Sequence, residues 1–109
     1  MLDLLQSRDA ERRQSREWLR EHVRTELRRH LAELLPGVPV FVFGSLTQSG
    51  KFHAESDIDI AFDSIPPSTT LYRLTGELME RLNRPVDVID LSESRLADKI
   101  RREGERWMP

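Results

Sequence analysis

Residues 38–63 read VPVFVFGSLTQSGKFHAESDIDIAFD and contain two segments that each predict a β-strand. The first segment, residues 38–43, is a continuous apolar run with a proline near its start, which is typical of a strand buried on both faces. The second segment, residues 57–63, alternates between large apolar residues and acidic or small ones, so its large apolar side chains share one face. The polar stretch between them, residues 46–56, predicts a loop with room for one helical turn.

The segment before this region predicts one long helix, from about Ser7 to Leu35. Apolar residues recur every four positions in its second half, and Pro36-Gly37 stops it. Its first half, residues 8–17, has no apolar side chain larger than Ala10, so we expect that half to project into solvent or to dock on another surface. The apolar positions are Leu19, Val23, Leu27, Leu31, Leu34 and Leu35.

The rest of the chain predicts two further helices and a third strand. Leucines at helical spacing predict a helix over 71–82, and a short apolar run predicts a strand over 86–89. A last helix is expected over 92–104, with Leu96 and Ile100 facing inward. The order α-β-loop-β-α-β-α predicts an α/β (α+β) fold, in which a small mixed sheet of about three strands is covered by helices.

The composition is that of a strongly charged globular chain without a marked overall charge. Of its 109 residues 33% are charged, yet the net charge is only -2, so no global field draws the chain toward nucleic acid or membranes. The length predicts a single domain over residues 1–109. Without cysteine there are no disulfides or thiolate metal sites. Since neither a signal peptide nor a membrane-length apolar stretch is evident, we expect a cytoplasmic protein.

Asp57 and Asp59 are the first candidates for chemistry. They flank Ile58 on the second predicted strand, so their side chains project from the same face. Two adjacent carboxylates repel each other, and each prefers to be protonated unless a divalent cation such as Mg²⁺ is shared between them. The alternative is an ordinary amphipathic edge strand with a wet acidic face, which an Asp-x-Asp pair alone does not exclude.

Two further motifs stand at strand positions. Gly44-Ser45 follows the first strand directly, where a glycine allows a sharp turn and a close approach of the backbone to an anion. The alternative there is a plain strand-to-helix turn, since Ser45 and Gln48 also have the spacing of a capping box. Asp87 lies in an apolar strand segment that we expect to be buried, where an acid needs a metal or a cationic partner such as Arg84.

Together these motifs resemble the signature of the DNA polymerase beta-like nucleotidyltransferase superfamily. The short chain and its ending, residues 100–104, are similar to the minimal nucleotidyltransferases in particular. The resemblance covers about residues 38–105 and implies a catalytic core with a palm-like nucleotidyltransferase fold there, while residues 1–35 form an additional N-terminal helix. The motifs are Gly44-Ser45, Asp57-x-Asp59 and Asp87.

The resemblance implies a metal-dependent nucleotidyltransferase. Asp57, Asp59 and Asp87 match the catalytic residues that hold two Mg²⁺ ions, or Mn²⁺ in their place. Gly44 and Ser45 match the residues that orient the phosphates of ATP or another nucleoside triphosphate. Minimal nucleotidyltransferases are typically paired with helical HEPN ribonuclease toxins. The resemblance therefore implies an antitoxin of a toxin-antitoxin system that transfers AMP from ATP to a tyrosine of its partner (AMPylation).

Two departures from the family pattern leave an alternative open. The eleven residues from Leu46 to Ser56 are one more than is usual, and the arginine that commonly follows Gly-Ser is missing. Lys51 is the one cation of this loop and is therefore a candidate nucleotide-binding residue. The alternative function is a catalytically silent antitoxin that neutralises its partner by binding alone. Neither membrane association nor direct nucleic-acid binding is expected.

The first predicted helix also carries arginines at every fourth position. Acidic residues lie between them, so the pattern is typical of a solvated helix with weak ion pairs. The alternative is a docking element for a partner. The arginines are Arg8, Arg12, Arg16, Arg20, Arg24 and Arg28.

Overall fold

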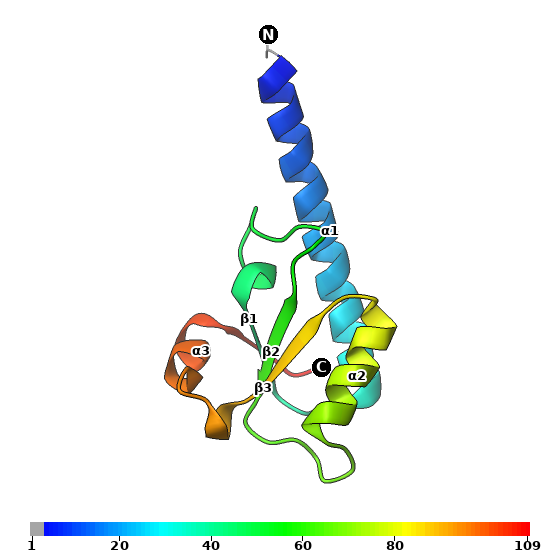
Figure 1. Ribbon diagram of the computed structural model, residues 1–109, viewed down its shortest axis with the longest axis vertical. Helices are drawn as coiled ribbons and strands as arrows, with labels where there is room; N and C mark the ends of the chain where they lie inside the picture. The colour runs from blue at the N-terminus through cyan, green and yellow to red at the C-terminus, as the bar shows by residue number, and fades with distance from the viewer. Residues whose placement is uncertain (1–3) are drawn as a thin grey trace.

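The structure, a computed structural model, describes residues 4–109. Its helices and strands follow the predicted order, with one strand added at the end (Figure 1). In chain order the elements are α1 (Leu4–Leu34), β1 (Val40–Phe43), the 3₁₀ turn η1 (Gly44–Thr47), β2 (Ile58–Phe62), α2 (Leu71–Leu82), β3 (Val86–Asp90), the 3₁₀ turn η2 (Leu91–Glu93), α3 (Ala97–Glu103) and β4 (Glu105–Trp107).

Within the described residues the strands form one mixed sheet in the order β3-β2-β1-β4. β1 pairs antiparallel with both β2 and β4, whereas β2 pairs parallel with β3. The α/β (α+β) class is confirmed, but the sheet has four strands where about three were predicted. The strand missing from the prediction is β4, because three residues with a single large apolar side chain, Trp107, are too short to show alternation.

The sheet is covered on both faces, which explains the continuous apolar run of β1. Val40 and Val42 point into the larger core, between the sheet and the helices α1 and α2. Phe41 points into a smaller cluster beneath α3, together with Ala61 of β2. The alternation predicted for β2 is confirmed, since its large apolar side chains are buried in the larger core: Ile58, Ile60 and Phe62.

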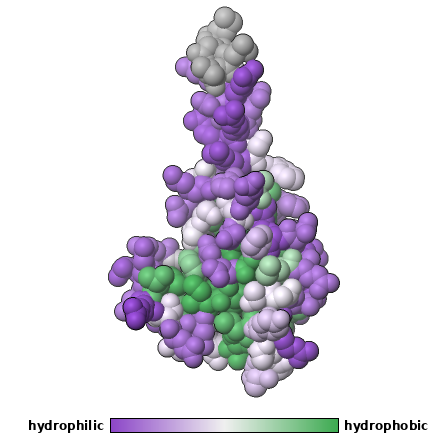
Figure 2. All heavy atoms as spheres, in the orientation of Figure 1, coloured by the Kyte–Doolittle hydropathy of each residue, from purple (hydrophilic) through white to green (hydrophobic). Residues whose placement is uncertain are grey.

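The second half of α1 packs its apolar side chains against this body, and the first half contacts the body through Glu17 near its end. Its buried apolar residues from Val23 to Leu31 lie in the larger core, as predicted, as does Leu35 just after the helix, and its first half extends beyond the sheet (Figure 1). The projecting half has a hydrophilic surface, whereas hydrophobic side chains gather on the body over and beside α3 (Figure 2). None of the helices in residues 4–109 combines the length and the apolar character that crossing a membrane requires.

The last helix is shorter than predicted. Residues 92–104 divide into η2 and the seven-residue helix α3, because two side chains bind the backbone locally. Asp90 accepts a hydrogen bond from the Ser92 N–H at 2.9 Å, and the Ser94 hydroxyl accepts one from the Leu96 N–H at 3.1 Å. Such local bonds compete with helix formation. Ile100 faces inward as predicted, but Leu96 precedes the helix and is 54% exposed.

Candidate active site

The pairing of three strands places two of the predicted acidic residues side by side. Asp59 lies opposite Phe43 of β1 and opposite Asp87 of β3. Residues in register on neighbouring strands point to the same face of a sheet, so both carboxylates lie on the face that α3 covers in part. Asp57 precedes β2 by one residue and interacts electrostatically with Asp59. The structure thus brings the three predicted acids into one region.

The electrostatics of this region are dominated by Asp59. Partial burial, followed by the negative charges of Asp87 and Asp57, raises the pKa of Asp59 from 3.8 to about 6. Within residues 4–109, however, no three Asp, Glu or His side chains lie close enough together to hold a metal ion as they stand. The three acids therefore repel one another without forming a closed ligand set.

The raised pKa of Asp59 predicts a pH dependence of stability. The folded state binds this proton more tightly than the unfolded state, so the stabilisation is complete below about pH 4 and is lost as the pH rises through about 6. With a chelator present to remove divalent cations, we expect the free energy of unfolding of Asp59→Asn at pH 8 to exceed that of the wild type by about 1 kcal/mol. This value is discounted because solvent screens the charge of a half-exposed group. At pH 4.5 the difference should shrink.

Urea unfolding at the two pH values measures this difference. Asp9→Asn is the matched control, because Asp9 is an exposed carboxylate on the projecting half of α1. Parallel pH profiles for Asp59→Asn and the wild type would show that folding does not raise the pKa of Asp59.

Asp87 differs from its predicted environment. It is exposed rather than buried, because β3 is an edge strand and its α3-facing side is open at this position. Arg84, the partner suggested by sequence, donates instead to the backbone carbonyl oxygens of His53, Ala54 and Ser56, at 3.3, 3.1 and 2.7 Å. Arg84 thereby fixes the loop that leads into Asp57. No sequence pattern pointed to this role.

Gly44 connects the Gly-Ser turn to the acidic residues. Its φ of 74° lies in the left-handed region, which glycine adopts without strain. A Cβ atom at this position would collide with Asp59 Oδ2, and would lie 3.3 Å from Asp59 Cγ. The turn therefore packs directly against the Asp59 carboxylate, and only glycine allows this approach.

The capping box predicted for Ser45 and Gln48 does not form. The turn is a 3₁₀ helix whose N-cap position is Phe43, with no side-chain cap. A capping box needs the first turn of an α-helix; here the Thr47 hydroxyl donates to the Gly44 carbonyl oxygen at 2.8 Å, and the Gln48 N–H donates to the Ser45 carbonyl oxygen at 3.1 Å. The Ser45 hydroxyl is therefore not used as a cap.

A cavity of about 270 Å³ adjoins the turn on the α3 side. One wall comes from β1 and η1, including Gly44, and the other from α3. Its cation is Lys99, which sequence reasoning missed; Lys51 does not line the cavity and is exposed on the loop. The only signal was the helical spacing that Leu96, just before α3, shares with the α3 residues that line the cavity: Lys99, Ile100 and Glu103.

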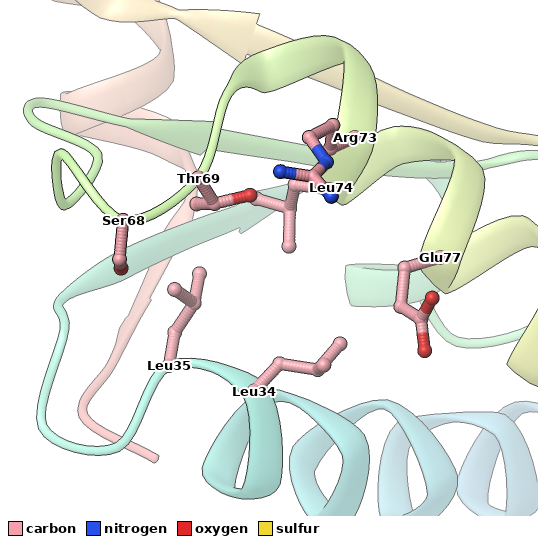
Figure 3. A pocket seen from close by; sticks show the side chains of 7 residues that line it. All are labelled: Leu34, Leu35, Ser68, Thr69, Arg73, Leu74 and Glu77. Carbon is pink, nitrogen blue, oxygen red and sulfur yellow. The ribbon is translucent and has the colours of Figure 1, made fainter.

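A second cavity, of about 290 Å³, lies away from this site. It opens between the end of α1 and the start of α2, where Leu34 and Leu35 face Ser68 and Thr69 (Figure 3). None of the predicted site residues lines it. Its position therefore separates it from the acidic residues and from the Gly-Ser turn.

The fold and the site agree with the chain's similarity to known proteins. The family described as "Polymerase beta, Nucleotidyltransferase" matches residues 38–107, a range that contains all four strands of the described sheet. The chain belongs to this polymerase beta nucleotidyltransferase family, which confirms the resemblance drawn from the three motifs. α1 precedes the matched range.

One similar solved structure is the crystal structure of a toxin-antitoxin with AMP-PNP. The identity is 27% and the TM-score 0.59, and the match covers 78% of this chain and 73% of that chain. None of the curated proteins matches this chain.

Proposed function

We propose that this protein is a metal-dependent antitoxin that transfers AMP from ATP to a hydroxyl group, on a tyrosine, of a partner HEPN ribonuclease toxin. The observation that carries the proposal is the position of Asp59, in register with Asp87 and in contact distance of the Gly44 turn. Carboxylates beside a phosphate-binding turn are what nucleotidyl transfer requires. Membership of the nucleotidyltransferase family and the similar toxin-antitoxin structure with AMP-PNP support it.

The residues fit a divalent cation chemically. Asp57, Asp59 and Asp87 are hard oxygen ligands, and Mg²⁺ prefers such ligands with phosphate oxygens and water completing its shell. Partial burial and then the repulsion by Asp87 and Asp57 raise the pKa of Asp59, and a bound cation would offset that repulsion. Asp57 and Asp87 are exposed, so their side chains are free to rotate toward Asp59. When bound, Mg²⁺ or Mn²⁺ supplies charge neutralisation on the triphosphate.

The chain's own residues divide the remaining work. Gly44 lets the backbone approach the phosphates, and the Ser45 hydroxyl, which is free of a capping role, donates to a phosphate oxygen. Lys99 in the adjoining cavity, and Lys51 on the loop, balance the charge of the phosphates.

Transfer then proceeds by in-line displacement. The acceptor hydroxyl oxygen bonds to the α-phosphorus, and the bond from that phosphorus to the oxygen bridging to the β-phosphate breaks. Pyrophosphate leaves with the electron pair of that bond. The hydroxyl proton passes to an Oδ atom of Asp87 and from there to water. Because Asp87 is exposed on an edge strand, a hydroxyl carried by another macromolecule can reach it.

A second candidate function is neutralisation by binding alone. The absence of a closed ligand set in the described residues favours it, and so does the lengthened loop after Gly44-Ser45. The two candidates differ in whether a covalent mark is left on the partner.

Labelled ATP separates the candidates. The protein is incubated with Mg²⁺ and the proposed partner toxin, with ATP labelled at either the α- or the γ-phosphate. We expect label on the partner from the α-position only, and none with a chelator. Label from the γ-position would indicate phosphoryl transfer. A partner that is neutralised without being labelled would support neutralisation by binding alone.

A further inference from the structure

Two arginines of α1 reach the same backbone oxygen in the Gly-Ser turn. Arg20 Nε donates to the carbonyl oxygen of Leu46 at 3.0 Å, and Arg24 Nη1 donates to it at 3.2 Å. Leu46 is the third residue of the turn, and its side chain is completely buried in the larger core. The turn is thus held by its side chain from within the core and by its carbonyl from α1.

Both guanidinium groups are themselves fixed. Arg24 forms a two-pronged ion pair with Glu105 of β4, at 2.6 and 3.1 Å, and lies over the Trp107 ring at 5.3 Å. Arg20 donates to Glu17 at 3.2 Å. The two arginine side chains are only 13% and 14% exposed. Charge-assisted bonds in such a sheltered place are stronger than those at the surface.

Glu17 extends this contact to the loop that follows the turn. Its Oε1 atom accepts a hydrogen bond from the Gly50 N–H at 2.7 Å and another from the Ser49 hydroxyl at 3.0 Å. Residues 46–50 are therefore tied to one face of α1 at two separate points.

Other arginines of the same helix behave differently. Arg29 forms ion pairs with Glu26 and Glu33 within α1, and its side chain is 53% exposed. Arg29 is not one of the arginines at every fourth position, but its ion pairs have the solvated arrangement predicted for them. Among the described residues, Arg20 and Arg24 alone donate to the Leu46 carbonyl oxygen, whereas the next arginine of the series, Arg28, lies over the Trp107 ring at 4.3 Å.

We infer that Arg20 and Arg24 are positioning residues that hold the Gly-Ser turn in the conformation that receives the triphosphate; this rests on the proposed function. The turn has no side-chain cap at its start, and the bonds within it, from the Thr47 hydroxyl and the Gln48 N–H, use the carbonyl oxygens of Gly44 and Ser45 and leave that of Leu46 to the two arginines. The positions after Ser45 carry no arginine. The guanidinium groups come instead from α1, which lies outside the family match.

The test compares Arg20→Gln and Arg24→Gln with the matched control Arg29→Gln. Affinity for AMP-PNP with Mg²⁺ is measured by calorimetry well below the melting temperature, and backbone hydrogen exchange is measured over residues 44–50. We expect each of the first two variants to bind AMP-PNP about tenfold more weakly, with faster exchange in that segment. Arg29→Gln should match the wild type in both. Arg20→Lys should recover part of the loss, since it retains one donor for the Leu46 carbonyl.

Two negative outcomes have different meanings. If the wild type binds AMP-PNP and Arg20→Gln and Arg24→Gln bind it equally well, the inference is overturned, whatever their melting temperatures. If the wild type does not bind AMP-PNP at all, the proposed function fails. Hydrogen exchange still decides in that case whether the two arginines order the turn, and unchanged exchange would overturn the inference as well.

Discussion

Asp87→Asn is expected to transfer AMP about 10³-fold more slowly than the wild type, the range lost when a positioned acid–base group is removed. Asn has almost the same shape as Asp but cannot take a proton from the attacking hydroxyl. Because Asp87 is exposed and repels Asp59, its replacement should leave the midpoint of urea unfolding unchanged or slightly higher. The rate is measured with α-labelled ATP and the partner protein.

Asp63→Asn is the control for this experiment. Asp63 follows β2 and forms an ion pair with Arg101 of α3, so this variant loses an exposed acid without touching the Asp59 region. It should transfer AMP at the wild-type rate. If the wild type leaves its partner unlabelled and Asp87→Asn still neutralises the partner, the proposal of AMP transfer is wrong and neutralisation by binding is the remaining candidate.

Gly44→Ala should lose both stability and transfer. The left-handed backbone costs an added side chain about 1 kcal/mol. The new Cβ would also push the Asp59 carboxylate out of place, which adds about 1–3 kcal/mol as overpacking. Since Asp59 moves, transfer should fall by more than about 100-fold even under conditions where the variant is folded. Circular dichroism and the labelled-ATP assay measure the two effects.

Gly37→Ala is the matched control for Gly44→Ala. Gly37 also has a left-handed φ, of 75°, but a Cβ there would meet no atom within 4 Å. It should therefore cost only the backbone strain and leave transfer intact. Equal losses in the two variants would mean that the Gly44 turn does not depend on its contact with Asp59.

Features with a regular sequence period were predictable from the sequence, whereas the order in which the strands pair in the sheet was not. The apolar stripe of α1 and the alternation of β2 each reflect one element facing one core, so they appear directly in the residue order. The shared face of Asp57 and Asp59 was predicted from the same alternation and stays a prediction, because Asp57 precedes β2 by one residue. In contrast, the exposure of Asp87 depends on β3 being at the sheet's edge, which a single strand's sequence does not encode.

Two of the arginine contacts that the sequence did not reveal join segments far apart in the chain. Arg84 binds the carbonyl oxygens of His53, Ala54 and Ser56, and Arg20 of α1 binds the carbonyl oxygen of Leu46. Arginine side chains are long and their acceptors here are backbone oxygens, so neither partner carries a recognisable pattern. Lys99 was missed for a related reason: its relation to Gly44 exists only once α3 lies against β1.

The position of Asp87 on an edge strand bears on how such a site would choose its acceptor. An exposed sheet edge binds a small hydroxyl compound weakly, because few side chains surround the compound there. Selectivity would then come from contacts that the partner protein makes away from its acceptor hydroxyl. The binding energy of those contacts would raise kcat/KM for the whole partner. Free tyrosine, which lacks those contacts, should be a far poorer acceptor than the same residue within its protein.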